Sequence, residues 1–287
     1  MKNKCHLVCG LALVSATTLF SVASVQAQVI ASDNFDSYSL SSLSSQTGAG
    51  TGLAGNWSAA ANSGSANVVA PGLGGGNGLQ MSVPSSSSSI MAARQLAAPI
   101  TGQNIYVSYL WQYAAGPGFG GTSGDSTTFA LALSDTATDT GVLNYGMRAT
   151  TGTQTFMTRQ GTGGPVAGAS LNLAGSVANP SSTYLLVAEY VWDGTKYSGI
   201  NAWINPTSLT QTTADVTLAT GGTLTSLSYV YFREGAPAIN AVFNTDNLKI
   251  GNTWADVVPA PEPGSIALLT LGAVTGLGFY RRGKRQV

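Results

Sequence analysis

Few side chains in the middle of this 287-residue sequence can do chemistry, and three aspartates are the most promising of them. Asp33 and Asp36 lie near the start of the middle span, and Asp246 lies near its end. Carboxylates and backbone carbonyls are the ligands that Ca²⁺ takes. If the first and last strands of the domain pair, these side chains approach one another, and the sequence predicts a structural calcium there. The alternatives are an Asx turn or an arginine partner such as Arg148.

Acid–base catalysis by paired carboxylates has little support. Glu189 and Glu234 are the glutamates between Gln28 and Ala260, whereas glycoside hydrolysis needs two carboxylates on one face. We expect Glu189 to pair with an arginine or to face solvent, and Glu234 to lie in a turn. The single histidine and both cysteines fall within the first ten residues, which excludes thiol catalysis, disulfides, Ser-His-Asp triads and His/Cys zinc sites from the middle span. The sequence predicts no catalytic residue.

Exposed aromatic rings stack on the apolar faces of sugars, and three residues are candidates for this role. Phe119 stands in a glycine-rich loop, where we expect it to be exposed. Trp111 and Tyr113 are further candidates, although most aromatic residues of a sandwich are buried in its core. The spacing G-x-G-x-x-G occurs at 116–121, but no helix follows it, so nucleotide binding is not predicted.

The distribution of charge argues against nucleic acid as a partner. The whole chain has 12 basic and 12 acidic residues and a net charge of zero. Between residues 28 and 260, six basic and eleven acidic residues leave a net charge of −5. No basic patch of the kind that binds nucleic acid is present in this span.

The first 27 residues have the pattern of an export signal. Two lysines precede an apolar stretch from Leu7 to Ala23, and Val25-Gln26-Ala27 places small residues at positions −3 and −1 of a signal peptidase site. We expect cleavage after Ala27, which makes Gln28 the first residue of the mature chain.

The last 29 residues, 259–287, form a second targeting segment. Pro261-Glu262-Pro263 precedes an apolar stretch from Ile266 to Tyr280, and basic residues crowd positions 281–285. A helix over 266–280 is about 22 Å long, somewhat less than the hydrocarbon core of about 30 Å, and the flanking arginines extend its reach by snorkelling. The sequence predicts a transmembrane helix with the basic tail on the cytoplasmic side.

The order of these three parts resembles the PEP-CTERM sorting signal of Gram-negative bacteria. The resemblance implies that an exosortase, an integral membrane protease-transpeptidase, recognises Pro261, Glu262 and Pro263 and removes the tail. The implied partners are therefore signal peptidase, exosortase and, before cleavage, the membrane. The implied destination is the cell surface, the outer membrane or the extracellular matrix. Nothing about the middle domain follows from this tail.

The elements between residues 28 and 258 read as short strands separated by Gly, Ser, Asn and Pro. Ile105–Tyr113 alternates, with Trp111 and Tyr113 on the same face as Ile105. Tyr184–Trp192 is apolar on both faces except at Glu189, as in a central strand, and Asp193-Gly194 after it predicts a hairpin. Other strands are expected at 129–134, 199–204, 227–232 and 241–250.

This pattern predicts one all-β domain, a two-sheet antiparallel jelly-roll sandwich, flanked by the signal helix and the transmembrane helix. A β-solenoid is the alternative, but it requires a fixed repeat that the sequence lacks. We expect flexible surface loops at 72–78, 85–89 and 116–124.

Asp33–Tyr38 and Asp246–Gly251 resemble the opening and closing strands of concanavalin-like and carbohydrate-binding-module jelly rolls, where the two termini pair in one sheet. The resemblance implies a structural calcium near that seam and a Trp57 that packs under the first loop. The expected function is a non-enzymatic, exported module that binds polysaccharide or another surface component. An enzyme acting on extracellular polysaccharide and a purely structural matrix protein are the alternatives.

Overall fold

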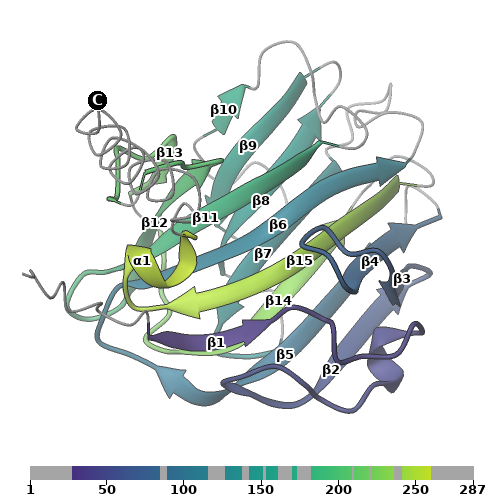
Figure 1. Ribbon diagram of the computed structural model, residues 1–287. Coiled ribbons are helices and arrows are strands. Elements are labelled where there is room, and N and C mark those ends of the chain that lie inside the picture. Colours follow the sequence, from purple (N-terminus) through teal and green to yellow (C-terminus); the bar gives the residue numbers. More distant parts are fainter. Residues whose placement is uncertain are drawn as a thin grey trace, which may run out of the picture.

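The computed structural model describes residues 28–84, 89–115, 127–137, 142–150, 153–160, 170–172, 182–208, 210–219, 221–235 and 241–259. Within these ranges the chain is nearly all β, and its strands form two antiparallel sheets that face each other (Figure 1). The predicted all-β, two-sheet class is confirmed. The predicted leader, sorting motif and transmembrane helix lie outside the described residues. No helix in the described ranges is long and apolar enough to cross a membrane.

Sheet A has eight strands, in the order β13-β12-β11-β6-β15-β4-β3, and β1 also pairs with β15. Its longest strands are the central ones. Its members are β1 (Val29–Asp33), β3 (Ser65–Val69), β4 (Gly78–Val83), β6 (Ile105–Ala115), β11 (Thr183–Trp192), β12 (Tyr197–Ile204), β13 (Val216–Leu218) and β15 (Ala241–Gly251).

Sheet B has seven strands, in the order β10-β9-β8-β7-β14-β5-β2. Two short helices complete the described part of the fold, the 3-10 helix η1 (Leu43–Ser45) and the α-helix α1 (Trp254–Val257). The members of sheet B are β2 (Leu53–Asn62), β5 (Ser89–Ile100), β7 (Thr127–Ser134), β8 (Leu143–Thr150), β9 (Thr153–Gln160), β10 (Ser170–Asn172) and β14 (Leu227–Gly235).

The core between the sheets is built on the alternation of β6. Tyr109, Trp111 and Tyr113 all point inward and are at most 2% exposed. Phe129 of sheet B meets Trp111 and Phe243 of sheet A, with ring centroids 6.4 and 5.3 Å apart. Such aromatic pairs add favourable contact energy to the area that they bury. The face predicted from the alternation is therefore the core face.

The two ends of the domain pair in sheet A, as predicted. Val29 of β1 lies opposite Gly251 of β15, and Asp33 lies opposite Leu248. The first strand ends at Asp33, however, and the residues after it form a turn in which the Tyr38 N–H donates to the Phe35 carbonyl at 3.2 Å. Figure 1 shows β1, the end of β15 and α1 together at one side of the sandwich.

The predicted hairpin after β11 is confirmed. Asp193 Oδ1 accepts the backbone N–H groups of Thr195 and Lys196 at 2.9 and 3.0 Å. Gly194 between them has a φ of +101°, which an L side chain rarely adopts. Aspartate and glycine thus close the turn that joins β11 to β12.

Candidate functional site

A row of neutral polar side chains crosses the outer face of sheet A, on five neighbouring strands. We call this set of side chains the amide row: Asn67, Gln80, Asn244, Gln112 and Thr183, which occupy successive register positions of β3, β4, β15, β6 and β11. Each points away from the core because its strand neighbours point inward. Five strands at about 4.8 Å spacing make the row about 19 Å long.

Hydrogen bonds join four of the five members of the amide row from strand to strand. Gln80 Nε2 donates to Asn244 Oδ1 at 3.1 Å, and Asn244 Nδ2 donates to Gln112 Oε1 at 3.2 Å. Gln112 Nε2 donates in turn to Thr183 Oγ1 at 3.4 Å. Since a primary amide has two N–H donors and two acceptor positions, Asn244 keeps a donor and an acceptor for a ligand. The row is therefore ordered and still able to bind hydroxyl groups.

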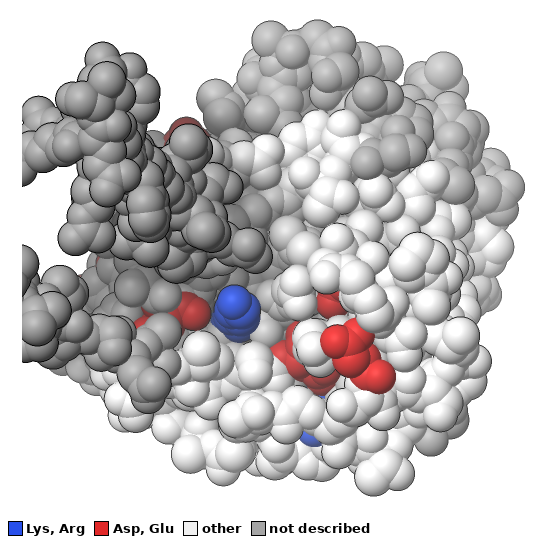
Figure 2. Space-filling view, viewed as in Figure 1, with Lys and Arg blue, Asp and Glu red and all other residues white. Residues whose placement is uncertain are grey.

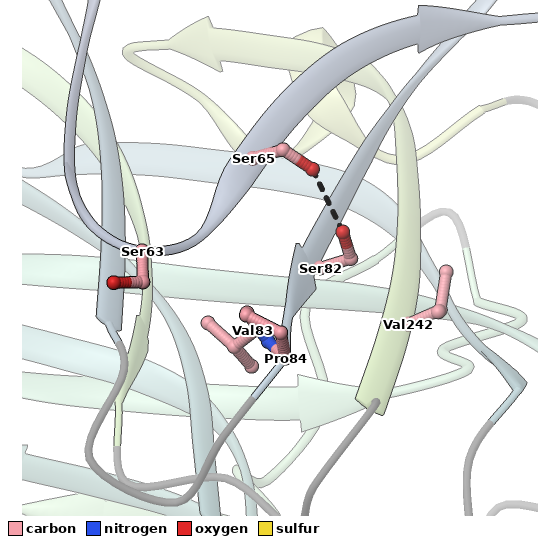
Figure 3. Close-up of a pocket in the computed structure, with 6 residues that line it drawn as sticks. All are labelled: Ser63, Ser65, Ser82, Val83, Pro84 and Val242. Carbon is pink, nitrogen blue, oxygen red and sulfur yellow. Dashed lines mark hydrogen bonds between the residues drawn. The ribbon is translucent and has the colours of Figure 1, made fainter.

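A pocket of about 280 Å³ adjoins the amide row at the edge formed by β3 and β4. We call it the serine pocket, and its lining consists of Ser63, Ser65, Ser82, Val83, Pro84 and Val242. Figure 3 shows Ser65 and Ser82 pointing toward one another, with their hydroxyl oxygens 2.8 Å apart. Asn67 Nδ2 donates to Ser65 Oγ at 3.4 Å, which connects the pocket to the row. Hydroxyls and small apolar groups together match the mixed surface of a sugar ring.

The side chains of the row and of the pocket are themselves uncharged. Figure 2 shows one cluster of acidic side chains, a separate acidic group beside a basic side chain, and a second basic side chain, while the rest of the described surface in this view carries no charge. Neutral amides and hydroxyls form hydrogen bonds with neutral ligands without the desolvation cost that charged groups carry. The arrangement thus suits a neutral, hydroxyl-rich molecule.

The aromatic residues predicted to bind sugars are not part of this surface. Trp111 and Tyr113 are buried in the core, so neither ring is open to a sugar. The prediction for these two residues is wrong, because the face that they share on β6 is the one packed against sheet B. Phe119 lies outside the described residues.

Asp33 is the centre of a buried network and does not belong to a calcium site. Its Oδ2 accepts hydrogen bonds from Tyr38 Oη at 2.7 Å, Trp57 Nε1 at 2.9 Å and Arg94 Nη1 at 3.0 Å. Its Oδ1 accepts the Phe35 N–H at 3.0 Å, as in an Asx turn. Both oxygens accept hydrogen bonds, so the predicted calcium ligand is instead an ion-pair partner of Arg94. Burial, followed by the charge of Asp33, raises the pKa of Tyr38 to about 12.

Asp36 and Asp246 do approach each other, as the predicted pairing of the termini requires. They hold the turn at 72–77: the Asn77 N–H donates to Asp36 Oδ1 at 2.7 Å, and the Gly74 N–H donates to Asp246 Oδ2 at 2.8 Å. Burial raises the pKa of Asp246 to about 6, and the charge of Asp36 adds to the effect. A Cβ at Gly76 would lie 1.8 Å from Asp36 Oδ1, so the turn needs glycine there. The loop expected to be flexible is thus tied to both carboxylates.

Of the three predicted calcium ligands, Asp36 and Asp246 lie near each other, and a calcium ion there stays a prediction. In the described ranges, no group of three or more His, Cys, Asp or Glu side chains is placed to hold a metal ion. Calcium takes six to eight oxygens in proteins. Asp36 and Asp246 are what remains of the predicted site once Asp33 is assigned to Arg94.

Glu189 is held by neutral donors rather than by an arginine. Its Oε1 accepts from Asn104 Nδ2 at 2.7 Å and from Tyr106 Oη at 2.8 Å. Its Oε2 accepts from Asn201 and Gln211, both at 3.0 Å. The side chain is buried, so the expectation of an arginine partner or solvent exposure is wrong. Four hydrogen bonds replace the missing cation, and they attach the segment that contains Gln211 to sheet A.

Glu234 lies inside the sandwich, not in a turn. It belongs to β14, opposite Ile90 of β5 and Phe129 of β7. Its side chain is fully buried, and neither carboxyl oxygen has a hydrogen-bond partner among the described residues. Burial raises the pKa of Glu234 to about 9. The group is therefore protonated at neutral pH, and it is not available to a substrate on the surface.

Comparisons with known proteins concern the arrangement of strands alone. No protein-family model matches the chain, and no curated protein sequence matches it. One similar solved structure is a variant of alginate lyase Aly36B in complex with alginate tetrasaccharide, which is 12% identical and covers 80% of this chain and 98% of its own, with a TM-score of 0.49. Another is the CBM22-1 xylan-binding domain from Paenibacillus barcinonensis Xyn10C, at 10% identity, 78% and 94% coverage and a TM-score of 0.35.

The amide row was not predicted from the sequence. Each member stands at an outward position of an alternating strand, which is an ordinary place for a polar residue. The members come from positions as far apart in the sequence as 67 and 244. Only the register of the five strands shows that they lie side by side. A search for amides at alternating positions of several strands would have found the candidates but not their order.

Proposed function

We propose that residues 28–258 form an exported module that binds a neutral polysaccharide on the outer face of sheet A. The amide row is the observation that supports this function best. Its hydrogen-bonding groups repeat once per strand, and this spacing of about 4.8 Å is close to the length of one sugar unit. A polymer that lies across the strands therefore meets a similar group at each unit. The serine pocket extends the same chemistry at one end of the row.

A carbohydrate-active enzyme has less support in the described residues. Glu234 is enclosed in the core, and all four donors around Glu189 are neutral side chains that already occupy its oxygens. Glycoside hydrolysis needs two carboxylates free to face the bond that breaks. The geometry favours binding over cleavage.

The binding surface is tested by removing one amide at a time. We expect Gln80→Ala and Asn244→Ala to weaken binding to the best glycan about tenfold each, the loss that accompanies one or two hydrogen bonds. Gln95→Ala is a matched control, because Gln95 is an exposed amide of β5 in sheet B. The measurement is a glycan screen with purified residues 28–258, followed by calorimetry on the best hit.

Three outcomes would contradict this function or its site. A screen without any binding favours the structural matrix protein. Release of reducing sugar during incubation favours the enzyme, and equal losses in Gln80→Ala and Gln95→Ala would show that the site lies elsewhere.

The proposed route to the cell surface is supported by the leader pattern and by the order of Pro261-Glu262-Pro263, apolar stretch and basic tail. We expect truncation after Ala260 to release the protein into the medium, because both the motif and the anchor are lost. Full-length Glu262→Ala is the matched variant that keeps the apolar stretch, and it should remain in the membrane fraction without reaching the surface. Immunoblots of medium, membrane and surface fractions measure both results. Unchanged surface retention of the truncated protein would contradict this route.

A further inference from the structure

The carboxylate of Asp256 receives the backbone of the first described residue. Gln28 N–H donates to Asp256 Oδ1 at 2.8 Å. On its other side, Asp256 Oδ2 accepts the N–H groups of Asn252 and Thr253 at 3.0 and 2.8 Å. The carboxylate therefore joins the start of β1 to the turn between β15 and α1.

Asp256 is enclosed as well as hydrogen bonded. It is 5% exposed, and its partners are backbone N–H groups, with no described Lys or Arg in an ion pair with it. It packs closely against Gly251, where a Cβ would lie 2.3 Å from the Asp256 Cβ. Gly251 is also the residue opposite Val29 in the β1–β15 pair. A buried carboxylate without a cation is uncommon, and of the three backbone nitrogens that donate to Asp256, that of Gln28 can become a cation.

We infer that removal of the leader completes an ion pair between the α-ammonium of Gln28 and Asp256, a step that rests on the export proposed above. Hydrolysis of the Ala27–Gln28 bond consumes one water, leaves a carboxylate on Ala27, and converts the Gln28 amide nitrogen into an ammonium group with three N–H donors. Charge-assisted hydrogen bonds are shorter and stronger than neutral ones. The cleaved chain therefore holds β1 against β15 more firmly than the uncleaved chain does.

The site is specific for a chain end at residue 28. One extra residue before Gln28 restores a neutral amide at this nitrogen and moves the ammonium by about 3.5 Å along the chain. The three N–H groups around Asp256 remain in that case, but the charge is lost from Oδ1. Asp256 thus distinguishes correct processing from processing that is displaced by one residue.

The test is a cycle of four full-length proteins, exported with their own leader and purified from membranes in detergent. All carry Gln28→Ser, because an amino-terminal glutamine can cyclise and lose its charge. Two of them have one additional serine inserted before position 28, and one protein of each kind carries Asp256→Asn. Intact mass and amino-terminal sequencing identify the first residue, and hydrogen exchange with mass spectrometry measures protection in residues 29–33.

We expect the inserted serine to speed exchange of residues 29–33 about three- to tenfold when Asp256 is present, the size of a partly buried ion pair. In the Asp256→Asn background, the insertion should change exchange by less than twofold. An amino terminus at position 28 with equal effects of the insertion in both backgrounds overturns the ion pair and leaves the export route intact. An amino terminus at any other residue overturns the cleavage site and the ion pair together.

Discussion

Arg94→Met is expected to lower the free energy of unfolding by about 3–5 kcal/mol, because it leaves the carboxylate of Asp33 buried without its cation. Arg94 and Asp33 are 3% and 2% exposed, and Nη1 lies 3.0 Å from Oδ2. Arg94 Nε also donates to the Gly55 carbonyl at 3.1 Å, and its Nη1 to the Ala49 carbonyl. One side chain therefore connects β5 to β1, to β2 and to the segment between them. Urea unfolding of residues 28–258, followed by tryptophan fluorescence, measures the loss.

The double variant separates the ion pair from simple loss of packing. Asp33→Asn alone should also be strongly destabilising, since it leaves the guanidinium buried and unpaired. Asp33→Asn combined with Arg94→Met removes both charges, and we expect it to be more stable than the sum of the single losses predicts. Lys196→Met, in the β11–β12 turn, should change stability by less than about 0.5 kcal/mol. Strictly additive losses would contradict a coupled pair.

Glu234→Gln is expected to stabilise the domain increasingly as the pH rises. In the folded domain, burial raises the pKa of Glu234 to about 9, from 4.5 for an ordinary glutamate. The protonated form is favoured by folding, so the contribution of this group to stability is fully present below pH 4.5 and is lost as the pH rises through 9. Each unit between the two values costs about 1.4 kcal/mol. The wild-type domain should therefore be less stable than the variant by about 3 kcal/mol at pH 7.

The stability of the variant is compared with that of wild type at each pH, so that the titration of the other carboxylates cancels in the difference. Urea midpoints of wild type and Glu234→Gln should coincide near pH 4.5 and separate steadily toward pH 8. Glu234→Met supplies an apolar side chain of similar length, and its advantage over wild type should grow with pH in the same way. A difference that is constant across this range would show that the carboxyl group reaches solvent or finds a partner when it ionises.

Local patterns in the sequence predict the strands and their inward faces well. Alternation in Ile105–Tyr113 identifies the core face of β6, and Asp193-Gly194 identifies the hairpin, because both depend on neighbouring residues only. Asp33 could not be assigned in this way, since its partner Arg94 is 61 residues away and is one of six basic residues in the middle span. Charge alone does not show which of these six basic residues pairs with Asp33.

The position of Glu234 could not be predicted for a different reason, because its local sequence favours the wrong structure. A glutamate beside a glycine favours a turn in the sequence, because ionised carboxylates are rarely buried. The pairing of β14 with both β5 and β7 continues through Glu234 and Gly235, and it carries the side chain inward. Tertiary pairing thus overrides the local preference, and the carboxyl group gives up its charge.

The course of β15 has a mechanical consequence. Val242, at its start, lines the serine pocket, and Gly251, at its end, carries α1 and the pairing with β1. Nine residues of extended strand separate the two, which is a distance of about 30 Å. A tether that leaves the domain after α1 would therefore be attached near one end of β15, and the serine pocket lies at the other end. Force applied to a bound polymer would be transmitted along the length of β15. This strand is hydrogen bonded to β6 along one edge and to β4 and β1 along the other.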